Sequence, residues 1–205
     1  MDTAIDPARR DAEVARLLGI DGAVDASPPG EDRVGYIPSG VAPIVRAIFD
    51  APITKEDVFV DLGSGLGKVA MLVHLLTGAR TRGVEIQPAL VARARESAAA
   101  LGLDAVSFEE KDARDADLAG GTVFFLYAPF TGPVLAATLE RLRGVARTRD
   151  IVVCALGIDL RGPEWKPPRP TDSLWLSIHD SGAAPRAAVP LPAHADAISR
   201  ERRWR

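Results

Sequence analysis

The part of the chain best suited to bind a ligand is a glycine-rich loop, Asp61-Leu62-Gly63-Ser64-Gly65-Leu66-Gly67. Its three glycines are spaced two residues apart, and a ligand can approach such a backbone closely because no Cβ stands in the way. Asp61 comes directly before the first glycine and supplies a carboxylate at the start of the loop. The loop therefore combines a backbone turn that a ligand can approach closely with one negative charge.

Two common glycine motifs do not fit this loop. A phosphate-binding P-loop would need glycine at position 62 and serine or threonine at position 69, where the chain has Leu62 and Val69. The dinucleotide fingerprint G-x-G-x-x-G would need glycine at position 68, which is Lys68. We therefore expect a ligand that needs no phosphate cradle at the loop.

Two further acidic residues follow later strand-like segments. Glu85 stands in Gly83-Val84-Glu85-Ile86, and Asp112 stands in Glu110-Lys111-Asp112-Ala113. The carboxyl ends of parallel strands meet at one edge of a sheet, where such folds bind ligands. We expect Asp61, Glu85 and Asp112 to converge on one crevice; the alternative for the last two is an ordinary loop carboxylate.

The elements that would position these residues alternate along the chain. Apolar, β-branched runs predict strands at residues 57–62, 81–86, 105–108, 122–127 and 150–156. Helical patterns lie between them and before the first strand, at residues 39–49, 66–76, 89–101 and 133–142. Near-continuous apolar strands separated by helices indicate a parallel sheet covered on both faces. The fold class is thus α/β, a doubly wound and mostly parallel sheet with helices on both faces.

Composition describes an ordinary globular protein. The chain has 205 residues, 47% of them hydrophobic, and a formal net charge of -3. This charge argues against a general electrostatic binder of nucleic acid, which is normally basic. There is one cysteine, Cys154, and the three histidines lie far apart in the sequence, so we expect no metal site.

The chain divides into three zones. Residues 1–35 carry eight acidic and four basic side chains and predict a short helix followed by a flexible link. Residues 36–180 hold the alternating strands and helices. Residues 181–205 are rich in alanine and proline, carry five arginines against two acids and have an arginine-rich end. Early acidic residues argue against a secretory leader, and no apolar run is long enough to span a membrane, so we expect a cytoplasmic protein.

An acidic residue followed by G-x-G-x-G resembles class I, seven-β-strand, S-adenosylmethionine-dependent methyltransferases. That resemblance implies a seven-stranded Rossmann-like sheet and S-adenosyl-L-methionine as cofactor. It places Asp61 at the cofactor's ammonium, Glu85 at its ribose hydroxyls and Asp112 at its adenine amino group. The same resemblance assigns the remaining cofactor contacts to Tyr36, Gly63, Ser64, Gly65, Gly67, Ile86, Ala113 and Tyr127.

A narrower resemblance covers roughly residues 34–180. The segments Val34-Gly35-Tyr36-Ile37-Pro38-Ser39 and Phe125-Leu126-Tyr127-Ala128-Pro129-Phe130 are similar to the protein lysine methyltransferases of this class. That branch includes the ATP synthase c-subunit lysine methyltransferase and its prokaryotic relatives, and distantly the disruptor-of-telomeric-silencing histone enzymes. By this resemblance Tyr36, Tyr127, Pro129 and Phe130 form the methyl-transfer channel. The acidic N-terminal segment and the arginine-rich end have no counterpart there.

The resemblance implies transfer of a methyl group to a protein lysine amine by in-line displacement. A lysine must lose its proton first, and a water-poor aromatic channel lowers its pKa from about 10.4. Methyltransferases acting on base amines carry Asn or Asp followed by Pro-Pro and an aromatic, but the corresponding segment here begins at Tyr127. The alternatives that stay open are a small-molecule N- or O-methyltransferase and a catalytically silent cofactor-binding module.

Overall fold

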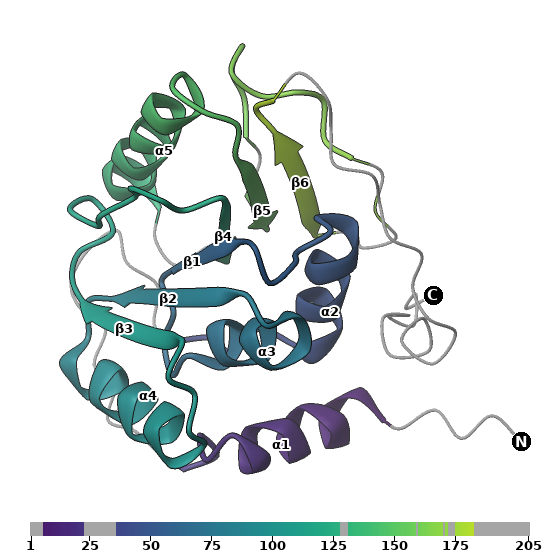
Figure 1. Cartoon of the computed structure of the whole chain (residues 1–205), viewed down its shortest axis with the longest axis vertical. Coiled ribbons are helices and arrows are strands. Elements are labelled where there is room, and N and C mark those ends of the chain that lie inside the picture. Colours follow the sequence, from purple (N-terminus) through teal and green to yellow (C-terminus); the bar gives the residue numbers. More distant parts are fainter. Residues whose placement is uncertain are drawn as a thin grey trace, which may run out of the picture.

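The computed structural model describes residues 6–22, 36–127, 131–158, 160–169, 171 and 175–182. Eleven helices and strands follow one another in this part of the chain (Figure 1). In chain order they are α1 (Pro7–Leu17), α2 (Val41–Asp50), β1 (Val58–Leu62), α3 (Lys68–Thr77), β2 (Arg80–Glu85), α4 (Pro88–Ala100), β3 (Val106–Glu110), β4 (Val123–Tyr127), α5 (Gly132–Ala146), β5 (Val152–Leu156) and β6 (Leu176–Asp180).

The strands form one sheet in the order β3-β2-β1-β4-β5-β6. The first five strands of this series are parallel to their neighbours, whereas β6 runs antiparallel to β5. This arrangement confirms the doubly wound α/β fold. Six strands lie in the described part of the chain; any seventh would lie outside the described residues. The strand order reverses between β1 and β4, and open α/β sheets bind ligands beside such a switch point.

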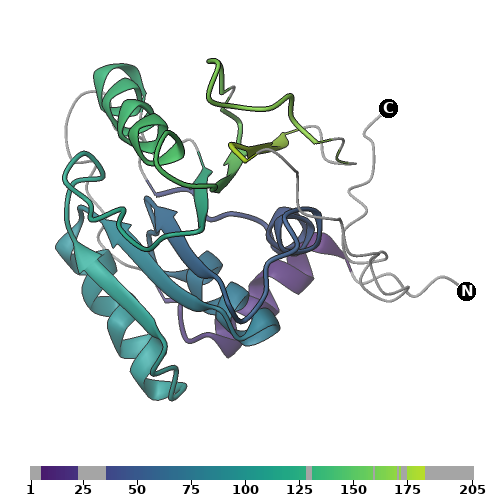
Figure 2. The same ribbon diagram turned by 45° about the horizontal axis from the view of Figure 1, so that its top comes forward.

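Helices cover both faces of the sheet (Figure 2). Side chains alternate along each strand, so Phe59 and Phe125 point to the face that carries α2, α3 and α4. Their rings lie 6.2 Å apart between centroids. Val60 and Phe124 point to the opposite face, where α5 packs. All four side chains are fully buried, which fixes the register of β1 against β4.

Helix α1 and the residues that follow it pack against the core of the domain. The Asp6 side chain caps its first turn by accepting from the Ala8 N–H at 2.8 Å. Just after the helix, Leu18 and Ile20 are buried in the cluster under α2 and α3. Ser97 of α4 donates a hydrogen bond to the Gly19 carbonyl at 3.2 Å. These contacts hold α1 beside the start of α2 and α3.

No helix in the described ranges is both long enough and apolar enough to cross a bilayer.

Candidate functional site

The glycine loop lies where β1 ends and α3 begins, and two of its glycines are required by geometry. Gly65 has a φ of +53°, and a Cβ there would lie 2.3 Å from the Tyr36 ring. Gly67 has a φ of +77°, and its Cβ would lie 2.3 Å from the Phe108 ring. A side chain at either position would be strained by the backbone and would clash with an aromatic ring.

Backbone hydrogen bonds hold the loop against β2. The amides of Gly63 and Ser64 both donate to the Val84 carbonyl, at 2.8 and 3.0 Å, and Gly67 N–H donates to the Ser64 carbonyl at 2.8 Å. The Ser64 hydroxyl is buried and has no hydrogen-bond partner in the described part of the chain. The loop is thus a fixed turn with one unsatisfied polar group.

Asp61, the acidic residue at the start of the loop, is buried, and no described residue supplies it with a counter-charge. It is 2% exposed, and its Oδ2 has no hydrogen-bond partner among the described residues. Burial, together with the nearby Glu85 carboxylate, raises the pKa of Asp61 to about 8. A buried carboxyl without a partner is costly, and a cation or hydrogen-bond donor from a ligand would satisfy it.

Glu85 is the last residue of β2, and its carboxylate binds the backbone of the glycine loop. Its Oε2 accepts from the Gly65 N–H at 3.0 Å, and its Oε1 accepts from the N–H groups of Ile86 and Gln87 at 2.9 and 3.0 Å. The carboxylate therefore sits 8% exposed at the edge of the loop with backbone donors on both oxygens. Oε2 accepts a single hydrogen bond and keeps a second lone pair, which a ligand hydroxyl can share.

Tyr36 lies half-buried across the glycine loop, with its ring against Gly65. Burial and the charges of Asp61 and Glu85 raise the pKa of the Tyr36 phenol to about 12. The phenol therefore keeps its proton at neutral pH and acts as a donor rather than as a base. These three side chains form one compact group around the loop.

Asp112 follows β3 at the same edge of the sheet. Glu85 pairs in register with Glu110, and the Lys111 N–H donates to the Glu85 carbonyl at 2.9 Å. Arg114 binds both Asp112 oxygens, with Nε at 3.0 Å from Oδ1 and Nη2 at 2.8 Å from Oδ2. An adenine amino group at Asp112 would have to share this carboxylate with the guanidinium.

The remaining predicted residues divide into two sets. Tyr127 ends β4 one position beyond the Leu62–Leu126 register pair and is half-buried, so it stands beside the end of β1. Ile86 is half-buried and Ala113 is buried next to Glu85 and Asp112. Pro129 and Phe130 lie outside the described residues. The structure thus gathers the predicted residues that it describes along the carboxyl ends of β1 to β4.

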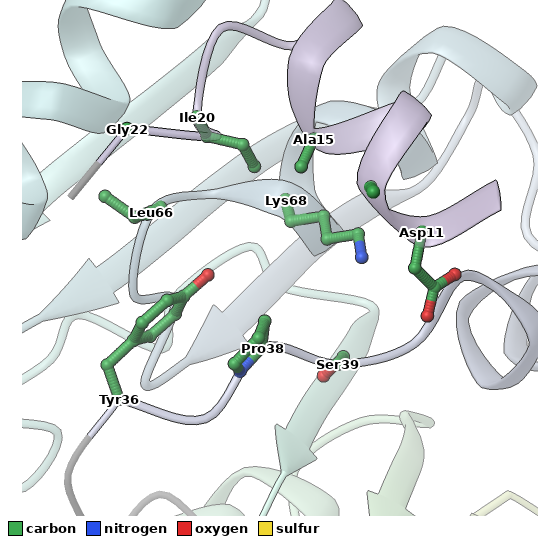
Figure 3. A pocket seen from close by; sticks show the side chains of 10 residues that line it. Asp11, Ala15, Ile20, Gly22, Tyr36, Pro38, Ser39, Leu66 and Lys68 are labelled. Atoms are coloured by element: carbon green, nitrogen blue, oxygen red, sulfur yellow. The ribbon is translucent and has the colours of Figure 1, made fainter. Parts of the chain in front are cut away.

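Two residues that matter here were missed from the sequence. Gly83 lies in β2 where a Cβ would be 2.5 Å from Phe108 and 2.6 Å from the Ser64 hydroxyl. A glycine inside a strand is the signal that could have marked this close approach. Lys68, directly after the loop, is buried and lines a cavity below α1 (Figure 3).

The residues present fit S-adenosylmethionine. Its ammonium would satisfy the orphaned Asp61 oxygen, and its lack of phosphate agrees with a loop that has neither of the phosphate-binding patterns. Gly65 carries no side chain, and the Tyr36 ring packs on it in the space that a Cβ would fill. Its ribose hydroxyls could donate to Glu85.

Comparison with known proteins agrees with this fit. A protein-family model described as a methyltransferase domain matches residues 53–124. A crystal structure of an RNA methyltransferase from Salinibacter ruber, in complex with S-adenosyl-L-homocysteine, is 29% identical with a TM-score of 0.55, covering 70% of this chain and 92% of that one.

The putative methyltransferase yhhF from Escherichia coli shares the fold at 15% identity and a TM-score of 0.50, covering 65% of this chain and 79% of that one. No curated protein matches the sequence significantly. The sheet with its glycine loop, the matched family model and the structural likeness agree. The chain therefore carries an S-adenosylmethionine-dependent methyltransferase domain.

Proposed function

We propose that this domain transfers the methyl group to the amine of a protein lysine. The observation that carries the proposal is the acidic, aromatic character of the crevice edge. Three carboxyl groups lie at the carboxyl ends of the neighbouring strands β1, β2 and β3, namely those of Asp61, Glu85 and Asp112. The Tyr36 ring packs on Gly65 of the glycine loop. A carboxylate-rich edge attracts a cationic acceptor, and an aromatic face holds an ammonium by a cation–π contact.

Three carboxylates would hold the cofactor. Asp61 would take the ammonium and Glu85 the ribose hydroxyls, while Asp112 would take the adenine amino group and loosen its pair with Arg114. The bound cofactor supplies a methyl group made electrophilic by its sulfonium. The glycine loop would fix the position of the amino-acid end, and such positioning accounts for much of the rate of a displacement reaction.

The acceptor amine must be neutral to react, and no base in the described site is suited to remove its proton directly. The Tyr36 phenol stays protonated because its pKa is about 12. We therefore assign deprotonation to the environment: burial beside Tyr36 and Tyr127 disfavours an ammonium and releases its proton to solvent.

RNA is a second candidate acceptor, and one observation favours it. The structure that shares 29% identity and aligns over 92% of its own length is that of an RNA methyltransferase. Lys111 and Arg114 are exposed at the same edge of the sheet and could contact phosphates. Against this, Arg114 is paired with Asp112 and Lys111 lies 3.5 Å from a Glu109 oxygen, so their charges are partly offset.

The test uses S-adenosylmethionine with a labelled methyl group and extract of the source cell. The proposal predicts label in a discrete band that is removed by protease, resists ribonuclease and yields methyl-lysine on hydrolysis. Glu85→Gln should abolish most of this label, whereas Glu96→Gln, an exposed acid on α4, should leave it unchanged. Ribonuclease-sensitive label would replace the lysine assignment with RNA, and label confined to small soluble compounds would replace it with a metabolite acceptor.

A further inference from the structure

The cofactor crevice takes up one half of the carboxyl edge of the sheet. The residues that would hold S-adenosylmethionine lie near the ends of three strands: Asp61 in β1, Glu85 in β2 and Asp112 after β3. The strand order β3-β2-β1-β4-β5-β6 puts these strands side by side in one half of the sheet. An acceptor therefore reaches the methyl group over the other half of the edge, where β4 and β5 end and β6 begins.

Trp175 stands at this second half of the edge. Tyr127, the last residue of β4, pairs in register with Leu156 of β5, and Leu156 pairs with Leu176, the first residue of β6. Trp175 directly precedes this row, and its carbonyl accepts from the Gly157 N–H at 2.8 Å. Neighbouring strands lie about 4.8 Å apart, so the backbones of Trp175 and Tyr127 are roughly 10 Å apart.

The backbone around Trp175 is anchored, yet its side chain is 68% exposed. Thr171 Oγ1 donates to the Leu176 carbonyl at 2.9 Å, and the Ser177 hydroxyl lies 3.3 Å from the Ile158 carbonyl. Among the described residues, Trp175 is the one aromatic member of the set of exposed large apolar side chains. A tryptophan on an anchored backbone provides a large contact surface at low conformational cost.

The chemistry of this edge favours a cationic group on Trp175. A tryptophan face attracts an ammonium or a guanidinium more strongly than the other aromatic side chains do. The chain has a formal net charge of -3, which favours the approach of a basic polypeptide. The acceptor lysine itself reacts as a neutral amine beside the cofactor. A cation held on Trp175 therefore belongs to another residue of the acceptor.

We infer that Trp175 binds a second basic residue of the acceptor protein, an arginine or lysine whose charged group stacks on the indole face. This inference rests on the proposed function and adds a sequence preference to it. An extended chain advances about 3.3 Å per residue, so the distance of roughly 10 Å between Tyr127 and Trp175 corresponds to about three residues. The acceptor should therefore carry a basic residue about two to four positions from the methylated lysine.

The labelled-methyl assay tests this role in the full chain. The extract concentration that gives half of the maximal rate serves as the apparent KM. We expect Trp175→Leu, which keeps an apolar side chain without an aromatic face, to raise this KM about fivefold and to leave kcat nearly unchanged. Trp175→Phe should recover most of the native KM. Leu75→Ala, at an exposed apolar position on α3, should match the native protein.

The sequence of the labelled site tests the predicted preference. Proteolysis of the labelled band and mass spectrometry locate the methyl-lysine, and we expect arginine or lysine about two to four positions away. A synthetic peptide of that sequence is then compared with one in which glutamine replaces this basic residue. The replacement should raise the KM of the native protein about fivefold and should hardly change that of Trp175→Leu.

Four results would overturn the inference. Native kinetics in Trp175→Leu would remove Trp175 from the acceptor site and leave the lysine assignment intact. Equal losses in Trp175→Leu and Trp175→Phe would show that stacking on a cation is not involved. Weaker binding of S-adenosylhomocysteine to Trp175→Leu in calorimetry would assign Trp175 to the cofactor instead. Label in RNA or in small compounds, but not in protein, would remove the proposed function and this inference together.

Discussion

Buried ionisable side chains of opposite type stand at the two ends of the glycine loop. Asp61 precedes the loop and faces the sheet edge, whereas Lys68 follows it and faces the cavity under α1. Both are more than nine-tenths buried. Asp61 Oδ2 has no hydrogen-bond partner among the described residues, whereas Lys68 has Asp11 close enough to raise its pKa against the larger effect of burial. A buried carboxyl oxygen without a partner is destabilising, so Asp61 indicates a cationic or hydrogen-bond-donating ligand group.

The loop therefore borders two different sites. The crevice of Asp61 and Glu85 suits the cationic end of S-adenosylmethionine, whereas the cavity under α1 is lined by Lys68 together with its counter-charge Asp11. Tyr36 lies between them, with its ring packed on Gly65. The experiments below test this difference between the two sites, beginning with the one for which we expect the largest effect.

The pH dependence of stability should report the Asp61 side of the comparison. The folded pKa of Asp61, about 8, lies above its ordinary value of 3.8, so the folded chain binds an extra proton between these values. Its contribution to the free energy of unfolding is therefore present at low pH and falls as pH rises from about 4 to about 8. The slope should approach about 1.4 kcal/mol per pH unit.

Urea unfolding at several pH values checks this expectation. In Asp61→Asn the free energy of unfolding should fall much less as pH rises. Asp104 is an exposed acid before β3, so Asp104→Asn should show the same fall as the native protein. The same slope in Asp61→Asn would mean that the buried carboxyl does not carry the extra proton.

Gly65→Ala should disturb the wall between the two pockets. The left-handed backbone of Gly65 and the 2.3 Å approach to Tyr36 should together lower the free energy of unfolding by about 2–4 kcal/mol. Gly102→Ala has a similar φ of +64° but no atom within 4 Å, so it should cost only about 1 kcal/mol. Equal costs in denaturant unfolding would show that the Tyr36 contact is not close.

Glu85→Gln should weaken the cofactor crevice without touching the cavity. It removes the charge that accepts from Gly65 N–H, and we expect binding of S-adenosylhomocysteine to weaken by about 1.5–3 kcal/mol. Glu96→Gln serves as the matched control. Calorimetry that gave the same affinity for Glu85→Gln and native protein would remove Glu85 from the cofactor site.

Lys68→Met should produce the smallest change, and it should raise the stability of the protein rather than lower it. Burial lowers the pKa of Lys68 in spite of the attraction of Asp11, so replacing the ammonium with an apolar chain of similar length should stabilise the protein by about 1 kcal/mol. Thermal unfolding measures this, with Lys55→Met at an exposed position as the control. A destabilised Lys68→Met variant would indicate that the attraction of Asp11 outweighs the cost of burying the ammonium.

Most of the fold could be predicted from the pattern of apolar runs. The segments predicted at residues 57–62, 122–127 and 150–156 became the central strands β1, β4 and β5, because each is apolar on both faces. The helix predicted from residue 66 begins instead at Lys68, since Gly67 is left-handed and cannot open a helix.

Strand β6 was missed because its pattern is mixed. Ser177 and His179 interrupt the apolar residues of Leu176–Asp180. The Ser177 hydroxyl lies 3.3 Å from both the Ala155 and Ile158 carbonyls, contacts that no local pattern announces. An antiparallel strand beside β5 is therefore visible only once the sheet is assembled.

The site was predictable where neighbours in sequence are neighbours in space. Asp61 and its glycines were located for this reason, and Glu85 and Asp112 followed from strand order. The Glu85 bond to Gly65 N–H and the Arg114 pair with Asp112 were not predicted, since they depend on side-chain placement. The cavity of Lys68 depends on Asp11 reaching Val41, thirty residues away, and sequence spacing carries no sign of it.

The most direct test of the central claim, that the buried carboxyl of Asp61 receives the cation of the cofactor, is proton release on cofactor binding. Calorimetric titrations at pH 7 in buffers of different ionisation enthalpy would measure it. Because Asp61 is protonated when unpaired and charged when paired, we predict release of about one proton per cofactor in native protein and in Asp104→Asn. Asp61→Asn should release none. Equal release from native protein and Asp61→Asn would contradict the account.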